Sequence, residues 1–178
     1  QLQVLSKSDP QKQMISKAPE HLWNLDVLLK VFPSARIVMT HRDPVRSIVS
    51  YASMISMFRR TAYKRPDFKQ LGSYVTKVFE RGMKKAILLR EKTDLTGKII
   101  DIHCDNIQEL PLQSIIKVCA FFEIEISKED KNQIKNWIKN KKLDAPGTHQ
   151  YDYETYGVDK ALIKEKFHFY NHKDYKEN

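Results

Sequence analysis

The stretch from Arg36 to Ser50 restricts the fold of this chain more than any other. Its sequence, RIVMTHRDPVRSIVS, predicts a strand, a tight turn and the first turns of a helix. The apolar run Ile37-Val38-Met39 is typical of a buried strand that is covered on both faces. Asp43 is a suitable N-cap for the following helix, and Pro44 is a suitable first residue. The stretch therefore predicts a strand–turn–helix unit of an α/β fold.

Two polar residues of this unit are candidate ligands for a phosphate group. Arg42 follows the predicted strand at its carboxyl end, where open α/β sheets bind ligands. Ser50 lies about two turns into the helix, at ~3.6 residues per turn. A guanidinium group and a hydroxyl can hold a phosphate together, through charge-assisted fork hydrogen bonds and one neutral bond. The alternative for Arg42 is an ordinary surface arginine.

The rest of the chain alternates strands with helices. Strands are predicted at residues 13–17, 36–40 and 98–103, and helices at residues 18–32, 44–58, 68–90, 111–122, 127–141 and 159–170. Residues 59–67 and 147–151 are predicted as loops. The 178 residues contain no internal repeat and no shift in composition. We therefore expect a single α/β domain over residues 1–178, with a parallel sheet flanked by helices.

Charge and composition restrict the class of function. The chain has 31 Lys and Arg against 22 Asp and Glu, a formal net charge of +9, which favours polyanionic partners. No apolar run approaches the ~20 residues of a membrane-spanning helix. Cys104 and Cys119 form neither a disulfide framework nor a metal-ligand spacing, so we expect no metal site. One hypothesis is thus a basic, non-catalytic module that binds RNA, a heparin-like polymer or an acidic membrane.

Polar residues also follow the ends of all three predicted strands. Because the carboxyl ends of parallel strands meet at one edge of a sheet, we expect these side chains to converge. Each of them also has a structural interpretation, since a lone histidine is more often structural than catalytic and an acid at a helix start is often a dipole partner. The residues are Lys17, Glu20 and His21; His41 and Arg42; and His103, Cys104 and Asp105.

Several of these segments resemble the sulfotransferase family. The segments are KAPEHL at residues 17–22, VFPSARIV at residues 31–38 and HRDP at residues 41–44. They are similar to the LKAPEHL, FPDARIV and HRDP segments of one branch of that family. Later, GTHQY at residues 147–151 and Tyr156-Gly157 are similar to its GKHRY and YGL segments. The resemblance covers roughly residues 13–170 and implies a P-loop-like sulfotransferase fold.

The resemblance implies a cofactor, 3′-phosphoadenosine 5′-phosphosulfate (PAPS), and transfer of a sulfonate group to a hydroxyl or amine. It implies that Arg42 and Ser50 bind the 3′-phosphate of the cofactor. Lys17 corresponds to a lysine that neutralises charge on the leaving phosphate. Glu20 or His21 is the candidate general base, and we favour His21 because of its ordinary pKa of ~6.5. The expected acceptor is a small molecule or a carbohydrate, and no nucleic acid is expected.

Three departures from the family pattern affect these expectations. A PRSGTT-like phosphosulfate loop is absent, so we expect it upstream of Gln1. The chain is then the carboxyl-terminal part of a longer enzyme, without the first strand and that loop. Thr148 and Gln150 replace basic residues of the GKHRY segment. His103-Cys104 replaces an aromatic residue near the adenine.

Overall fold

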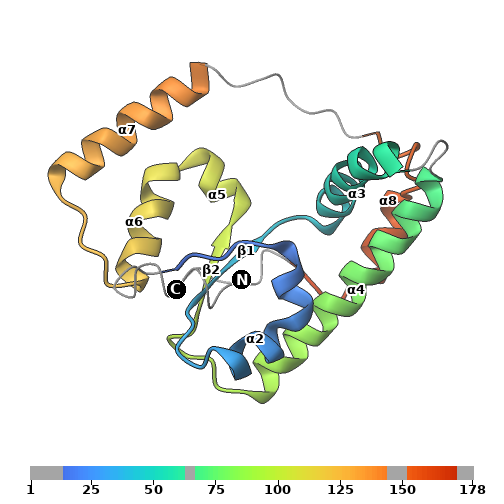
Figure 1. The fold of residues 1–178 in the computed structure, drawn as a ribbon, viewed down its shortest axis with the longest axis horizontal. Helices are drawn as coiled ribbons and strands as arrows, with labels where there is room; N and C mark the ends of the chain where they lie inside the picture. Colours follow the sequence, from blue (N-terminus) through green and yellow to red (C-terminus); the bar gives the residue numbers. More distant parts are fainter. Residues whose placement is uncertain (1–13, 63–66, 144–151, 172–178) are drawn as a thin grey trace.

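The computed structural model describes residues 14–62, 67–143 and 152–171, with no side chains for 141–143. Its elements, in chain order (Figure 1), are η1 (Pro19–Asn24), α2 (Leu25–Val31), β1 (Ile37–His41), α3 (Pro44–Ala62), α4 (Phe68–Lys92), β2 (Ile99–His103), α5 (Cys104–Glu109), α6 (Pro111–Phe121), α7 (Lys128–Leu143) and α8 (Lys160–Lys166).

The two strands form a parallel sheet, as the sequence predicts. Ile37 pairs with Ile99 at one end, and His41 pairs with His103 at the other. The helices α3 and α4 connect the two strands and pack against each other, and α4 also packs against η1 and α2 (Figure 1). Because the two strands begin and end opposite each other, the residues that follow both strands lie at the same edge of the sheet. The predicted convergence is therefore confirmed for two of the three strand ends.

The predicted strand at residues 13–17 is wrong for its described residues. Residues 14–17 form no regular secondary structure and lead directly into η1. Met14 and Ile15 are 45% and 93% exposed. A β-strand is stabilised by hydrogen bonds to a neighbour and by burial of its apolar face. Neither is present here among the described residues, so a short apolar run was not sufficient for a strand.

The prediction that the first buried strand is covered on both faces is also wrong. In β1, Met39 and His41 are buried, whereas Val38 is 38% exposed and Thr40 is exposed. In contrast, the consecutive residues 100–102 of β2 are all buried. The helices α5 and α6 pack against β2. In the described part of the chain, the face of β1 that carries Val38 and Thr40 is thus not covered by α5 and α6.

The main core lies between α3, α4 and the carboxyl-terminal segment. Ile48, Val49 and Ala52 of α3 are fully buried, as their helical spacing predicts. They pack in one cluster with Leu71 and Val75 of α4 and with Tyr156, Val158, Ile163 and Phe167 near α8. This core fixes the direction of α3, which carries both Ser50 and, at its start, the turn with Arg42.

Two glycines allow close packing on α4. A Cβ atom at Gly72 would collide with the backbone carbonyl of Tyr156, and one at Gly82 would collide with the ring of Trp23. Both positions are buried. Glycine is needed here because the neighbouring groups approach the helix backbone directly.

Several helix boundaries differ from the predictions. The helix α3 continues to Ala62, so residues 59–62 are helical rather than part of the predicted loop, and residues 63–66 lie outside the described residues. Arg59 and Arg60 are good helix formers, and a proline restricts mainly the residue before it. The predicted helix at residues 18–32 begins as a 3₁₀ turn, α5 was not predicted, and α8 ends at Lys166.

Ser127 and Asp130 form a capping box. The Ser127 hydroxyl accepts a hydrogen bond from the Asp130 backbone N–H (3.0 Å), and the Asp130 carboxylate accepts one from the Ser127 N–H (2.9 Å). These bonds satisfy two backbone donors at the start of α7. The predicted loop at residues 147–151 lies outside the described residues. No described helix is both long and apolar enough to cross a membrane.

Candidate functional site

The turn between β1 and α3 has the geometry that its sequence predicts. The Asp43 carboxylate accepts hydrogen bonds from the backbone N–H groups of Val45 (2.7 Å) and Arg46 (3.2 Å). Pro44 is the first residue of α3. The cap therefore starts a helix of 19 residues directly at the carboxyl end of β1. This places the positive end of the helix dipole beside Arg42.

Arg42 and Ser50 are both half-buried on this unit. Burial raises the pKa of the Cys104 thiol, and the positive charge of Arg42 acts in the opposite direction. Arg42 follows β1 and is therefore close to Cys104, the residue that follows β2. Its positive charge acts on the carboxyl ends of both strands. Ser50 lies further along α3. A guanidinium group at a helix start and a hydroxyl about two turns later on the same helix are a donor set that suits a phosphate. Their phosphate-binding role stays a prediction.

The three other candidate residues lie at or before η1. Lys17 is exposed and precedes η1 without being at the end of a strand. The Glu20 carboxylate accepts a hydrogen bond from the hydroxyl of Tyr51 (2.9 Å), the residue after Ser50 on α3. His21 shares a hydrogen bond with the Ser16 hydroxyl through Nε2 (2.9 Å). The structure thus brings Glu20 to the helix that carries Ser50.

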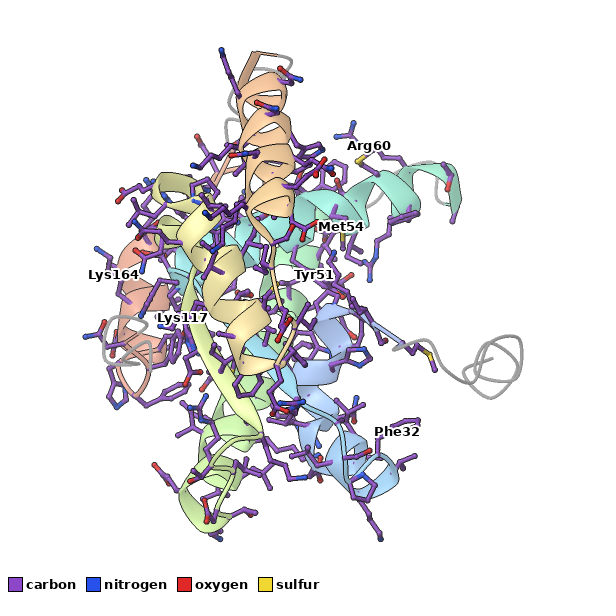
Figure 2. The ribbon with its side chains drawn as sticks, turned by 90° about the vertical axis from the view of Figure 1, so that its left-hand side faces the viewer. Phe32, Tyr51, Met54, Arg60, Lys117 and Lys164 are labelled. Carbon is purple, nitrogen blue, oxygen red and sulfur yellow. The ribbon has the colours of Figure 1, made fainter. Side chains whose placement is uncertain are left out.

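Tyr51 was not predicted as a site residue, and its ring is held by an aromatic cluster. It packs edge-on against Trp23 and Phe79, with ring centroids 6.4 Å and 5.3 Å away. Trp23 and Phe79 contact each other at 5.0 Å. In Figure 2, Tyr51 lies between α3 and the segment that contains η1. Burial, followed by the hydrogen bond and charge of Glu20, raises the pKa of Tyr51 to about 12.

A buried polar network includes His41, the residue that precedes Arg42. His41 shares a hydrogen bond with the Tyr170 hydroxyl through Nδ1 (2.9 Å) and with Asp101 through Nε2 (2.7 Å). Arg90 of α4 donates two hydrogen bonds of 2.7 Å to the two oxygens of Asp101. The network joins both strands, α4 and the segment after α8. It supports the structural interpretation of His41, which is 1% exposed.

The network also keeps Asp101 ionised. Burial alone would raise the pKa of this carboxyl, but the hydrogen bonds from Arg90 and His41 outweigh it and hold the pKa well below its usual range. The sequence did contain a signal for this group. Asp101 is a carboxylate in the middle of the otherwise apolar strand Ile99–Ile102, where a buried charge requires a partner.

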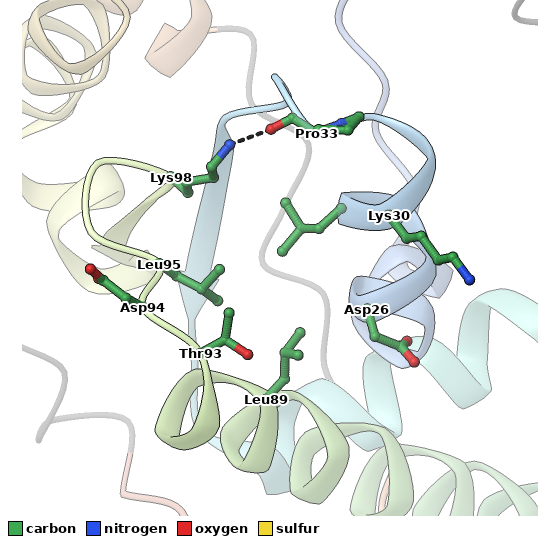
Figure 3. A pocket seen from close by; sticks show the side chains of 9 residues that line it. Asp26, Lys30, Pro33, Leu89, Thr93, Asp94, Leu95 and Lys98 are labelled. Atoms are coloured by element: carbon green, nitrogen blue, oxygen red, sulfur yellow. Dashed lines mark hydrogen bonds between the residues drawn. The ribbon is translucent and has the colours of Figure 1, made fainter.

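Two of the pockets in the part of the chain that the structure describes lie near the ends of the sheet. One, of about 250 Å³, is lined by residues 43–45 of the turn and by residues near α8, including Lys164, His168 and Asn171. The other, of about 360 Å³, lies at the opposite end of the strands (Figure 3). Its wall contains Leu89 and Leu95, and Asp26, Lys30 and Lys98 are among its charged residues. The Lys98 ammonium donates to the Pro33 carbonyl at its rim. Of the two, only the smaller cavity adjoins the turn that follows Arg42.

Comparison with known proteins gives a consistent result. A model of the sulfotransferase family matches residues 2–128. The sulfotransferase STF9 from Mycobacterium avium has a similar structure, with a TM-score of 0.78 and 19% identity, over 99% of this chain and 45% of that chain. STF1 from Mycobacterium tuberculosis H37Rv has a TM-score of 0.69 and 27% identity, over 93% of this chain and 42% of that chain. No curated protein sequence matches. The chain thus spans less than half the length of these two structures.

Proposed function

The chain belongs to the sulfotransferase family, and we propose that the protein transfers a sulfonate group from PAPS to a hydroxyl or amine of a small-molecule or carbohydrate acceptor. The observation that carries this proposal is the β1–turn–α3 unit, with Arg42 at the capped start of a long helix and Ser50 two turns later. Both side chains are half-buried, so they can contact a ligand and still be held by the protein.

We assign the 3′-phosphate of the cofactor to Arg42 and Ser50. The guanidinium can form a bidentate, charge-assisted pair with phosphate oxygens, and the hydroxyl can donate one further hydrogen bond. These donors select a nucleotide with a phosphate on the ribose over one without it, which is a specific expectation for binding.

We assign roles in the sulfonate-transfer step to the candidate residues at or before η1. When bound, PAPS would supply the sulfonate, with the acceptor oxygen or nitrogen bonding to sulfur as the bridging S–O bond breaks and its electron pair leaves with adenosine 3′,5′-bisphosphate. Lys17 neutralises negative charge on the leaving phosphate. Glu20 or His21 takes the proton of the acceptor. The exposed position of Lys17 before η1 leaves it accessible to a bound ligand.

Nucleotide binding tests the assignment of Arg42 and Ser50. Calorimetric titrations compare adenosine 3′,5′-bisphosphate with adenosine 5′-monophosphate, which lacks the 3′-phosphate. Wild type should prefer the bisphosphate, and Arg42→Ala should remove most of that preference, by about 10-fold to 100-fold for lost hydrogen bonds to a charged group. Arg81→Ala, an exposed arginine on α4, is the matched control. An unchanged preference in Arg42→Ala would exclude Arg42 from the phosphate site.

Activity is tested on the full-length protein with radiolabelled PAPS and a panel of simple alcohols, phenols, amines and sugars. Transfer by wild type and its loss in Arg42→Ala, with Arg81→Ala unaffected, is the expected result. A wild-type protein that binds the bisphosphate but transfers sulfonate to none of these acceptors would contradict the proposed acceptor classes. A wild-type protein that does not bind the bisphosphate would contradict the proposed function itself.

A further inference from the structure

We infer that Tyr51 is a positioning residue: its hydroxyl holds one oxygen of the Glu20 carboxylate, so that the other oxygen of Glu20, rather than His21, receives the acceptor proton. This inference rests on the proposed function and goes beyond it by choosing between the two candidate bases. The observation behind it is the 2.9 Å hydrogen bond from the Tyr51 hydroxyl to Glu20 Oε1. It joins η1 to α3 over 31 positions of sequence.

The bond has a fixed direction. The pKa of Tyr51 is raised to about 12, so the phenol keeps its proton at neutral pH and acts as a donor. The acceptor is therefore Glu20 Oε1. The second oxygen, Oε2, makes no hydrogen bond to the part of the chain that the structure describes, and Glu20 is exposed. A carboxylate with one oxygen anchored and the other accessible is suitably arranged for a general base.

The anchor itself is rigid. Tyr51 packs edge-on against Trp23 and Phe79, which also contact each other, so these two rings fix its position. Trp23 in turn lies against α4 at Gly82, where no side chain could fit. A tyrosine ring held on several sides loses little further freedom when its hydroxyl binds a partner. Glu20 is thereby tied to the same helix that carries Ser50, one residue earlier.

His21 is arranged differently. One of its ring nitrogens, Nε2, shares a hydrogen bond with the Ser16 hydroxyl, from a segment without regular structure. The other titratable groups near the pair are Tyr74 of α4, whose charge acts on Tyr51, and Lys85 of α4, which contacts the Trp23 carbonyl (3.3 Å) and Asp26 (2.7 Å). Among the described residues, Tyr51 is thus the hydrogen-bond partner of the Glu20 carboxylate.

A double-mutant cycle on the full-length protein tests the inference. The forms are wild type, Tyr51→Phe, Glu20→Gln, the double variant, and Tyr74→Phe as the control. Tyr74 is 58% exposed on α4. The readouts are the rate of sulfate release from saturating PAPS with water as acceptor, and the Kd of adenosine 3′,5′-bisphosphate. Water serves as acceptor so that no natural substrate needs to be known.

We expect Tyr51→Phe to lower the rate by about 10-fold or more while the Kd changes by less than about 2-fold. The double variant should be no slower than Glu20→Gln alone, because Tyr51 acts through Glu20. Tyr74→Phe should match wild type. A merely structural role would instead raise the Kd, which means weaker binding, and leave the rate at saturating PAPS unchanged.

Three results would overturn the inference without affecting the proposed function. These are a wild-type rate in Tyr51→Phe, losses in the double variant that equal the product of the two single losses, and a wild-type rate in Glu20→Gln. If wild type neither binds the bisphosphate nor releases sulfate, the proposed function fails and the inference fails with it. The wild-type binding measurement therefore separates the two cases.

Discussion

Replacing Asp101 with asparagine should strongly destabilise the fold. The Asp101 side chain is only 7% exposed and accepts hydrogen bonds of 2.7 Å from His41 and, twice, from Arg90. Asparagine removes the negative charge and leaves Arg90 without its carboxylate. Breaking a buried pair in this way typically costs about 3–5 kcal/mol, and the lower figure applies because the Arg90 side chain is 23% exposed and can be partly hydrated. That is a large share of the ~5–15 kcal/mol of a typical domain.

The loss of unfolding free energy in Asp101→Asn should depend on pH in a defined direction. The pKa of Asp101 is lower in the folded state than in the unfolded chain, so its stabilising effect is complete above the unfolded pKa of ~3.9. It decreases as the pH falls through the native pKa. The difference between wild type and Asp101→Asn should therefore be constant from about pH 5 to 7 and should narrow below about pH 4.

Urea unfolding followed by far-ultraviolet circular dichroism measures both effects. Asp105→Asn, an exposed aspartate on α5, is the control and should change the free energy of unfolding by less than about 0.5 kcal/mol. Adding Arg90→Met to Asp101→Asn removes the unpaired charge and should recover part of the loss. A loss below about 1 kcal/mol at neutral pH, or one that does not narrow in acid, would refute the role assigned to this network.

Three further predictions follow from the packing, the site and the charge. Gly72→Ala should lower the free energy of unfolding by about 1–3 kcal/mol, because its Cβ would meet the Tyr156 carbonyl. Ser73→Ala on the exposed side of α4 is its control in the same urea-unfolding experiment. Ser50→Ala should weaken bisphosphate binding by about 10-fold or more in the calorimetric titration, and equal affinity would remove Ser50 from the site. Bisphosphate binding should persist at high salt, whereas a polyanion-binding module would lose heparin affinity steeply as salt increases.

Local signals explain why much of the fold was predictable from sequence. The apolar run before Arg42, the Asp43 cap and Pro44 act over a few residues, so β1, the turn and the start of α3 followed from their own sequence. The core face of α3 followed from its period, since Ile48, Val49 and Ala52 are fully buried.

Features that depend on distant neighbours were not predictable in the same way. Residues 14–17 have the composition of a strand but lack a partner among the described residues. His41 meets Asp101 and Tyr170 across 60 and 129 positions, and Tyr51 meets Glu20 across 31. The spacing of apolar residues within a short segment gives no information about such long-range contacts. The charge of Asp101 inside an apolar strand indicates that a partner exists, but the fold is needed to identify Arg90.

The hydrogen bond between His41 and Tyr170 has a consequence for the order of folding. It closes a loop of 129 positions, whereas Arg90 and Asp101 are only 11 apart. Closing a long loop costs more chain entropy than closing a short one, so long-range contacts form more slowly. On chain entropy alone, the Arg90–Asp101 pair should therefore form before the contact of His41 with Tyr170. A refolding chain should reach near-native helix content before the His41 ring is sealed from solvent.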